Sequence, residues 1–428
     1  MTRLLIKNGR VIDPANKIDR QLDVLVEKGR IVAVGEDIPA SGAEVIEAKG
    51  KVVAPGFIDM HVHLREPGRE DEETIYSGTR AASAGGFCGV VAMANTNPVA
   101  DKQEVVKFVL RQALEQGTVA VYPVGAVTKG LKGEELAEMG ELKEAGVVAV
   151  SDDGEPVRNS SLMRCALEYT RQFNLVLISH AEDKDLSQGG VMDEGFNSTV
   201  LGLPGIPALA EEIMVARDIK LAGLTGGKLH LAHLSTTGSI QLLREAKKRG
   251  LRVTAEAAPH HFSLTSDAVK DYDPNTKTNP PLRSRLDVEA VIKGLEDGTI
   301  DAIASDHAPH SLEEKEVEYG IAASGIVGLE TAVGLSLNFL YHEKKIKLPE
   351  IIRKFTTGPA GILGLDEGTL SVGARANITI LDLEQEWVVD KDKFFSRSRN
   401  TPFHGLKLKG KAVMTIYQGK IVYHAASG

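Results

Sequence analysis

The chain has little cysteine and no long apolar run. Only Cys88 and Cys165 occur among its 428 residues, which excludes a disulfide framework and indicates a reducing compartment. No stretch of about 18 consecutive apolar residues is present, and the N-terminus lacks a basic segment followed by an apolar one. We therefore expect a cytoplasmic protein with no membrane partner.

An excess of basic residues is also missing. The chain has 50 Lys and Arg against 59 Asp and Glu, which gives a net charge of -9 without any basic block. This balance argues against non-specific nucleic-acid binding. It does not exclude an anionic small substrate, because arginines near the site can bind an anion whatever the net charge of the chain. A hydrophobic content of 42% and a charged content of 25% are typical of a globular protein.

Short apolar segments separated by glycine-containing turns occupy both ends of the chain. They lie at 4–7, 23–26 and 30–34, and again at 376–381, 412–417 and 420–423. The stretch 27–32 is also similar to the stretch 417–422. These patterns predict antiparallel strands, and we expect residues 1–51 and 365–428 to form one small composite β-sandwich domain.

Apolar runs alternate with segments of helical period through the middle of the chain. Eight of these runs predict strands, at 52–63, 89–96, 119–127, 147–153, 175–181, 228–235, 252–258 and 301–306. Eight strand-and-helix units indicate an α/β fold, a (β/α)₈ TIM-like barrel over residues 52–364. In such a barrel the chemistry lies at the carboxyl ends of the strands.

Polar residues stand at the ends of five predicted strands and should therefore meet. His61 and His63 are two positions apart on the first strand, so they point to the same side. The other strand-end residues that we expect to bind metal are Asp153, His180, His233 and Asp306. Imidazoles and carboxylates together suit borderline divalent cations, with zinc first.

Each of these residues also has a simpler interpretation. His180 alone would more often be a hydrogen-bonded core histidine, and His230 is expected to be structural. Asp152 and Asp153 point in opposite directions, so at most one is a ligand, and the other caps the turn before Gly154. The coincidence of five strand ends favours a metal site.

Six ligands exceed what one cation with an open position needs, which favours two cations bridged by a carboxylate. Such a pair would produce a bridging hydroxide near neutral pH and polarise a carbonyl group. Asp306 would take the proton from that hydroxide and return it to a leaving nitrogen. A role for Asp306 as a plain metal ligand stays open.

At this point the residues resemble a known family. The run His61-Val62-His63-Leu64-Arg65, together with His180, His233 and the stretch 305–310, is similar to the amidohydrolase superfamily. Within it, the motifs at 95–98, 152–154 and 278–283 resemble the class I bacterial dihydroorotases. The resemblance covers essentially the whole chain.

The resemblance implies a ligand set and an activity. It assigns His61 and His63 to one zinc ion and His180 and His233 to a second, with Asp153 bridging and Asp306 as ligand and acid–base. It implies reversible conversion of N-carbamoyl-L-aspartate into dihydroorotate in pyrimidine biosynthesis. It also implies one or two zinc ions per subunit and a homodimer, either alone or assembled with aspartate transcarbamoylase.

The fourth predicted strand and the loop before Asn95 differ from patterns seen among relatives. Many superfamily members bridge the metals with a carboxylated lysine, but this strand has no lysine and ends in Asp152-Asp153. Met93-Ala94-Asn95 has alanine where relatives have proline. That change removes no expected ligand.

Arg65 is the candidate for recognising a substrate carboxylate, because its planar guanidinium matches that group. The resemblance adds Asn95, Asn279 and His310 as substrate contacts. The alternatives are a salt bridge from Arg65 to Glu66 or another loop acid, and turn roles for the two asparagines. The charged segment 311–325 is either a mobile lid or an ordinary solvated loop.

Two rival functions remain at this stage. One is another cyclic-amide hydrolase, an allantoinase or hydantoinase, against which Arg65 argues. The other is a non-catalytic barrel that supports aspartate transcarbamoylase, against which the complete set of expected ligands argues.

Overall fold

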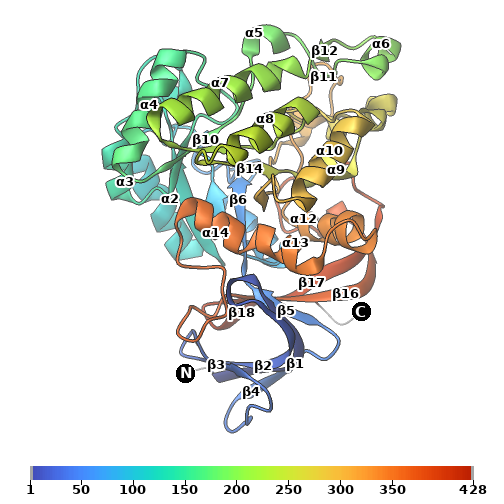
Figure 1. Cartoon of the computed structure of the whole chain (residues 1–428). Coiled ribbons are helices and arrows are strands. Elements are labelled where there is room, and N and C mark those ends of the chain that lie inside the picture. The colour runs from blue at the N-terminus through green and yellow to red at the C-terminus, as the bar shows by residue number, and fades with distance from the viewer. Residues whose placement is uncertain (1–2, 426–428) are drawn as a thin grey trace.

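Two eight-stranded sheets organise the chain in the computed structural model, which describes residues 3–425 (Figure 1). One sheet forms a parallel barrel, and the other is a mixed sheet built from both chain ends. The blue N-terminal strands and the red strands β16 and β17 lie together below the barrel in Figure 1. The predicted fold class is confirmed.

The mixed sheet has the strand order β18-β17-β16-β5-β1-β2-β3, with β4 beside β1. Strand β1 pairs antiparallel with β2 and parallel with β4 and β5, and β16 joins the two chain ends by pairing with β5. The strands are β1 (Arg3–Asp13), β2 (Ile18–Glu27), β3 (Arg30–Gly35), β4 (Glu44–Glu47), β5 (Val52–Pro55), β16 (Ile378–Val388), β17 (Lys407–Tyr417) and β18 (Lys420–His424).

The two similar stretches at the chain ends form hairpins that touch each other. Gly29 and Gly419 turn them with φ angles of 77° and 74°, a conformation that favours glycine. A Cβ atom on Gly419 would lie 2.8 Å from the Cα atom of Gly29. The packing of the two turns therefore needs small residues at both positions.

The barrel strands follow one another in the order β15-β14-β13-β10-β9-β8-β7-β6. They are β6 (Phe57–Val62), β7 (Phe87–Ala92), β8 (Ala120–Gly125), β9 (Ala149–Ser151), β10 (Val176–Ser179), β13 (Lys228–Leu231), β14 (Val253–Ala257) and β15 (Ala302–Ile303). A parallel bridge between Val62 and His307 closes the ring, and the His63 amide donates to the His307 carbonyl over 2.8 Å.

Helices cover the outside of the barrel (Figure 1). Helix α8, for example, begins where Thr236 accepts a hydrogen bond from the Ser239 amide, and it buries Ile240, Leu243 and Ala246. The larger helices are α1 (Ile75–Gly85), α2 (Gln103–Gln116), α3 (Met139–Ala145), α4 (Ser160–Gln172), α7 (Leu209–Thr225), α8 (Thr237–Lys248), α10 (Arg285–Glu296), α13 (Leu348–Phe355) and α14 (Thr357–Leu363).

Short elements occupy the loops that follow the barrel strands. They include α5 (Lys184–Ser187), α6 (Phe196–Leu201), α9 (Pro259–Ser263), α11 (Leu312–Lys315), α12 (Ala332–Ser336) and the strand pair β11 (Met192–Asp193) and β12 (Gly205–Ile206). Within residues 3–425, no helix combines the length and apolarity needed to cross a membrane.

The predicted strand 52–63 is two strands, because the chain passes from one sheet to the other at Gly56. Strand β5 belongs to the mixed sheet, whereas β6 opens the barrel. The Gly56 amide donates to the Asn377 carbonyl over 2.8 Å, and a Cβ atom here would lie 2.5 Å from the Cys88 sulfur. Glycine therefore permits the close crossing, and the division of domains at residue 52 stays a prediction.

Candidate metal centre and substrate pocket

Four histidines and two aspartates come together at the carboxyl ends of five barrel strands, all of them buried. His61 lies within β6, and the others lie within three residues of a strand end. Those residues are His63 after β6, Asp153 after β9, His180 after β10, His233 after β13 and Asp306 after β15.

Asp153 is the centre of this group. Its Oδ1 atom lies 3.4 Å from His61 Nε2 and 3.6 Å from both His180 Nδ1 and His233 Nε2. Its Oδ2 atom lies 3.5 Å from His63 Nε2. Burial alone would raise the Asp153 pKa, but the surrounding imidazoles outweigh burial and hold it well below its ordinary value. An ionised carboxylate whose two oxygens face different histidines suits a bridge between two cations.

Asp306 approaches the group from the last strand. Its Oδ1 atom lies 3.4 Å from His63 Nε2 and 3.6 Å from His61 Nε2. Burial raises the pKa of this carboxyl, but the hydrogen bond with His63 and the charges of His61 and His233 outweigh it and lower that pKa. Asp306 is therefore ionised at neutral pH and able to accept a proton.

The spacing of these atoms fits divalent cations such as zinc. Two ligand atoms about 2.1 Å from zinc at a tetrahedral angle are about 3.4 Å apart, close to the separations around Asp153 and Asp306. His61 Nε2 and Asp153 Oδ1 are also buried without a hydrogen-bond partner, and such atoms are costly unless something binds them. His180 Nδ1 and His233 Nε2 lie 3.0 Å apart.

Acidic and amide side chains contact the imidazole nitrogens that face away from Asp153 and so orient the rings. Glu256 lies 2.7 Å from His61 Nδ1 and 3.2 Å from His230 Nε2. Asn95 Oδ1 lies 2.9 Å from His63 Nδ1, and Glu182 Oε2 lies 3.0 Å from His180 Nε2. Such contacts fix the ring nitrogen that faces a metal.

Sequence analysis missed Glu182 and Glu256. Glu256 is a carboxylate inside the short apolar strand β14, between Ala255 and Ala257. That placement is a usable signal, because an unpaired buried carboxylate is costly. His230, expected to be structural, holds Glu256 in place.

The two adjacent aspartates have different surroundings. Asp152 Oδ1 accepts hydrogen bonds from the amides of Val127 and Thr128 over 2.7 and 3.0 Å. Asp152 therefore anchors the loop after β8 and does not face the histidines.

Arg65 is buried beside the centre, in a left-handed conformation with a φ of 62°. Its Nε atom donates to the Pro309 carbonyl over 3.1 Å and lies 3.0 Å from Glu72 Oε2. Its Nη2 atom lies 3.4 Å from His310 Nε2. The alternative of a salt bridge to a loop acid is thus present, with Glu72 as the acid, whereas Glu66 accepts from the Ile75 amide.

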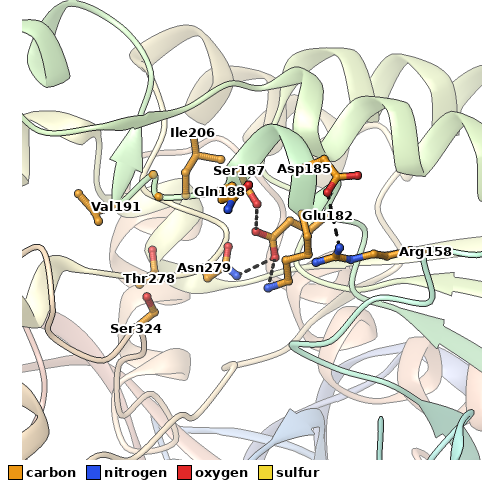
Figure 2. A pocket seen from close by; sticks show the side chains of 13 residues that line it. Arg158, Glu182, Asp185, Ser187, Gln188, Val191, Ile206, Thr278, Asn279 and Ser324 are labelled. Atoms are coloured by element: carbon orange, nitrogen blue, oxygen red, sulfur yellow. Dashed lines mark hydrogen bonds and ion pairs between the residues drawn. The ribbon is translucent and has the colours of Figure 1, made fainter. Parts of the chain in front are cut away.

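A cavity of about 540 Å³ lies next to His180 and is lined by Asn279, Glu182 and Lys184 among others (Figure 2). Glu182 Oε2 accepts from Asn279 Nδ2 over 3.0 Å and lies 2.9 Å from Lys184 Nζ. The same Asn279 nitrogen is 3.4 Å from His180 Nε2. Asn279 therefore lies between the cavity and the candidate metal centre.

The segment 311–325 is held by contacts within itself and with neighbouring loops. Within the segment, Lys315 Nζ donates to the carbonyls of Ala323 and Gly325 over 2.7 and 3.2 Å, and Tyr319 is buried against Met192 and Val269. His310, just before it, lies 2.7 Å from Glu314 through Nδ1. Its role as a lid stays a prediction.

Comparisons with known proteins identify relatives of the chain. A dihydro-orotase-like family model matches residues 50–239, and an amidohydrolase family model matches residues 323–423. The chain is 58% identical to a dihydroorotase of Pelotomaculum thermopropionicum, over 98% of both chains. It is 52% identical to a dihydroorotase of Acetivibrio thermocellus, also over 98% of both.

Solved structures show the same architecture. The L-hydantoinase of Arthrobacter aurescens superposes with a TM-score of 0.89 at 25% identity, covering 100% of this chain and 97% of that one. The dihydropyrimidinase of Brevibacillus agri gives 0.85 at 21% identity, covering 99% and 95%.

Proposed function

The chain belongs to the dihydroorotase family of the amidohydrolases, and from this premise we propose how its residues carry out the reaction. The protein is a cyclic amide hydrolase that interconverts dihydroorotate and N-carbamoyl-L-aspartate. We assign it to class I, with two zinc ions held by His61, His63, Asp153, His180, His233 and Asp306. The convergence of four imidazoles on the two oxygens of Asp153 supports this assignment most strongly.

The reaction adds water to the ring amide carbonyl of dihydroorotate and breaks the bond from that carbon to the ring nitrogen. When bound, the cations would acidify the water and polarise the carbonyl. Asp306 accepts the proton from the water and delivers it to the departing nitrogen. In the reverse direction Asp306 accepts the proton from the ureido nitrogen and delivers it to the departing oxygen as the ring closes.

We propose that Arg65 and His310 bind the free carboxylate of the substrate, with Asn95 and Asn279 completing the pocket. Arg65 is nearly buried and has its Nη2 atom turned toward His310, so the two side chains lie side by side near Asp306. This placement favours a carboxylate-bearing ring over the substrates of an allantoinase or hydantoinase.

Arg65 and His310 form the proposed carboxylate clamp. Replacement of Arg65 should weaken substrate recognition while the metal centre keeps its cations. For Arg65→Met we expect kcat/KM for dihydroorotate to fall about 100-fold, because a charge-assisted, paired contact is lost. Arg158→Met, at an exposed cation that lines the cavity beside Asn279, is the matched control and should stay within twofold. Unchanged turnover of dihydroorotate by Arg65→Met would refute the clamp.

Removal of the cations should abolish activity reversibly. A chelator that strips the protein should leave less than about 1% of the activity, since the carbonyl and the water both lose their activation. Added Zn²⁺ should restore turnover, and elemental analysis should give up to two ions per chain. A stripped protein with full activity would contradict the proposal. A zinc-loaded protein with no activity would instead favour the non-catalytic barrel.

We further propose that the protein works in the cytoplasm as a homodimer, alone or assembled with aspartate transcarbamoylase. The free state of both cysteines supports a reducing compartment. Size-exclusion chromatography with light scattering, with and without the transcarbamoylase, tests the assembly.

A further inference from the structure

Glu72 lies almost completely buried beneath the Arg65 side chain, with 1% of its surface exposed. We propose that Glu72 is a positioning residue for substrate recognition, which holds the Arg65 guanidinium so that its outer edge faces the carboxylate of the substrate. This inference rests on the proposed clamp role of Arg65. It adds a residue that does not itself touch the substrate.

The Nε atom of the Arg65 guanidinium faces the protein. Arg65 Nε lies 3.0 Å from Glu72 Oε2 and donates to the Pro309 carbonyl over 3.1 Å. The outer edge contacts His310 Nε2 at 3.4 Å, a distance near the limit of a hydrogen bond. Because a guanidinium is planar, fixing one edge also fixes the direction in which the other edge presents its donors.

A second arginine, Arg69, connects Glu72 to Glu314. Arg69 Nη2 pairs with the carboxylates of both Glu72 and Glu314. Glu314 in turn lies 2.7 Å from His310 Nδ1. Arg69 therefore joins the two glutamates, and both proposed carboxylate-binding side chains belong to one connected network.

The local backbone explains why this acid, and not its neighbours, reaches Arg65. The Arg69 amide donates to the Arg65 carbonyl and the Glu72 amide to the Arg69 carbonyl, over 3.1 and 3.0 Å. These turns fold the chain back over Arg65. Glu70, two residues earlier, is exposed and accepts from the Gly68 amide, so it offers the same charge without the contact.

The test combines Glu72→Gln with a double-mutant cycle. We expect Glu72→Gln to raise the KM for dihydroorotate about tenfold, as for one weakened charged contact, with kcat within twofold. Glu70→Gln removes the same charge from the same loop and should leave both constants within twofold. In an Arg65→Met background, Glu72→Gln should raise KM less than twofold, because the residue acts through Arg65.

Each outcome separates the two proposals. An Arg65→Met variant with normal KM would refute the clamp itself. If Arg65→Met raises KM but Glu72→Gln does not, only the positioning role fails. If Glu72→Gln changes KM equally in both backgrounds, or lowers kcat and the melting temperature with no change in KM, Glu72 has a merely structural role.

Discussion

Asp153→Asn should lower turnover of dihydroorotate by about a thousandfold or more and should also release metal. The loss of a supporting residue behind a metal ligand already costs 10- to 100-fold, and Asp153 is proposed to bridge both cations. The amide keeps the shape of the side chain but replaces one oxygen with an N–H₂ group that cannot bind a cation. Elemental analysis of the purified variant and a dihydroorotate assay measure both effects.

The neighbouring Asp152→Asn is a demanding control, because the same change is made one residue away. Asp152 holds the amides of Val127 and Thr128, so its replacement should cost about 1 kcal/mol of stability while metal content stays normal. If Asp152→Asn lost metal and Asp153→Asn kept it, the assignment of the bridge would be reversed.

Asp306→Asn should reduce kcat by roughly a thousandfold, because an asparagine cannot accept and return a proton. The pKa of Asp306 is lowered in the folded protein, so the wild-type carboxylate is ionised across neutral pH and ready to act as a base. KM should change little, since the proposed carboxylate clamp lies elsewhere. Steady-state kinetics in both directions, with metal content measured on the same sample, give the comparison.

Asp301→Asn is the matched control for Asp306→Asn, because Asp301 lies just before the same strand, β15. Asp301 pairs with Lys247 over 2.6 Å and accepts from the Ala255 amide over 3.0 Å, away from the histidines. We expect its kcat to stay within twofold of the wild type. An Asp306→Asn variant that retains both metal and near-normal kcat would remove Asp306 from the proton path.

The barrel and most of the candidate site could be predicted from sequence because they depend on periodicity. Alternation along a strand places His61 and His63 on one side, and parallel strands bring their carboxyl ends together. The choice of Asp153 over Asp152 came only from family resemblance. The surroundings of Asp152 and Asp153 in the fold agree with it.

Contacts between distant segments could not be predicted in the same way. The Pro55-Gly56 pair within the apolar run at 52–63 is a local turn signal, but it does not reveal that Gly56 separates two sheets. The pairing of Arg65 with Glu72 depends on how the chain folds back between these two residues, and the contact of Glu256 with His61 joins residues 195 positions apart. Spacing in the sequence carries no information on such pairs.

The line where the first and last barrel strands meet passes directly through the catalytic centre. Val62 and His307 form that junction, and each stands next to a proposed metal ligand, His61 and His63 on one side and Asp306 on the other. Opening the ring there would separate those ligands from each other. A cation pair bound by residues from both sides would therefore hold the two strands together, and we expect added Zn²⁺ to raise the temperature of heat inactivation.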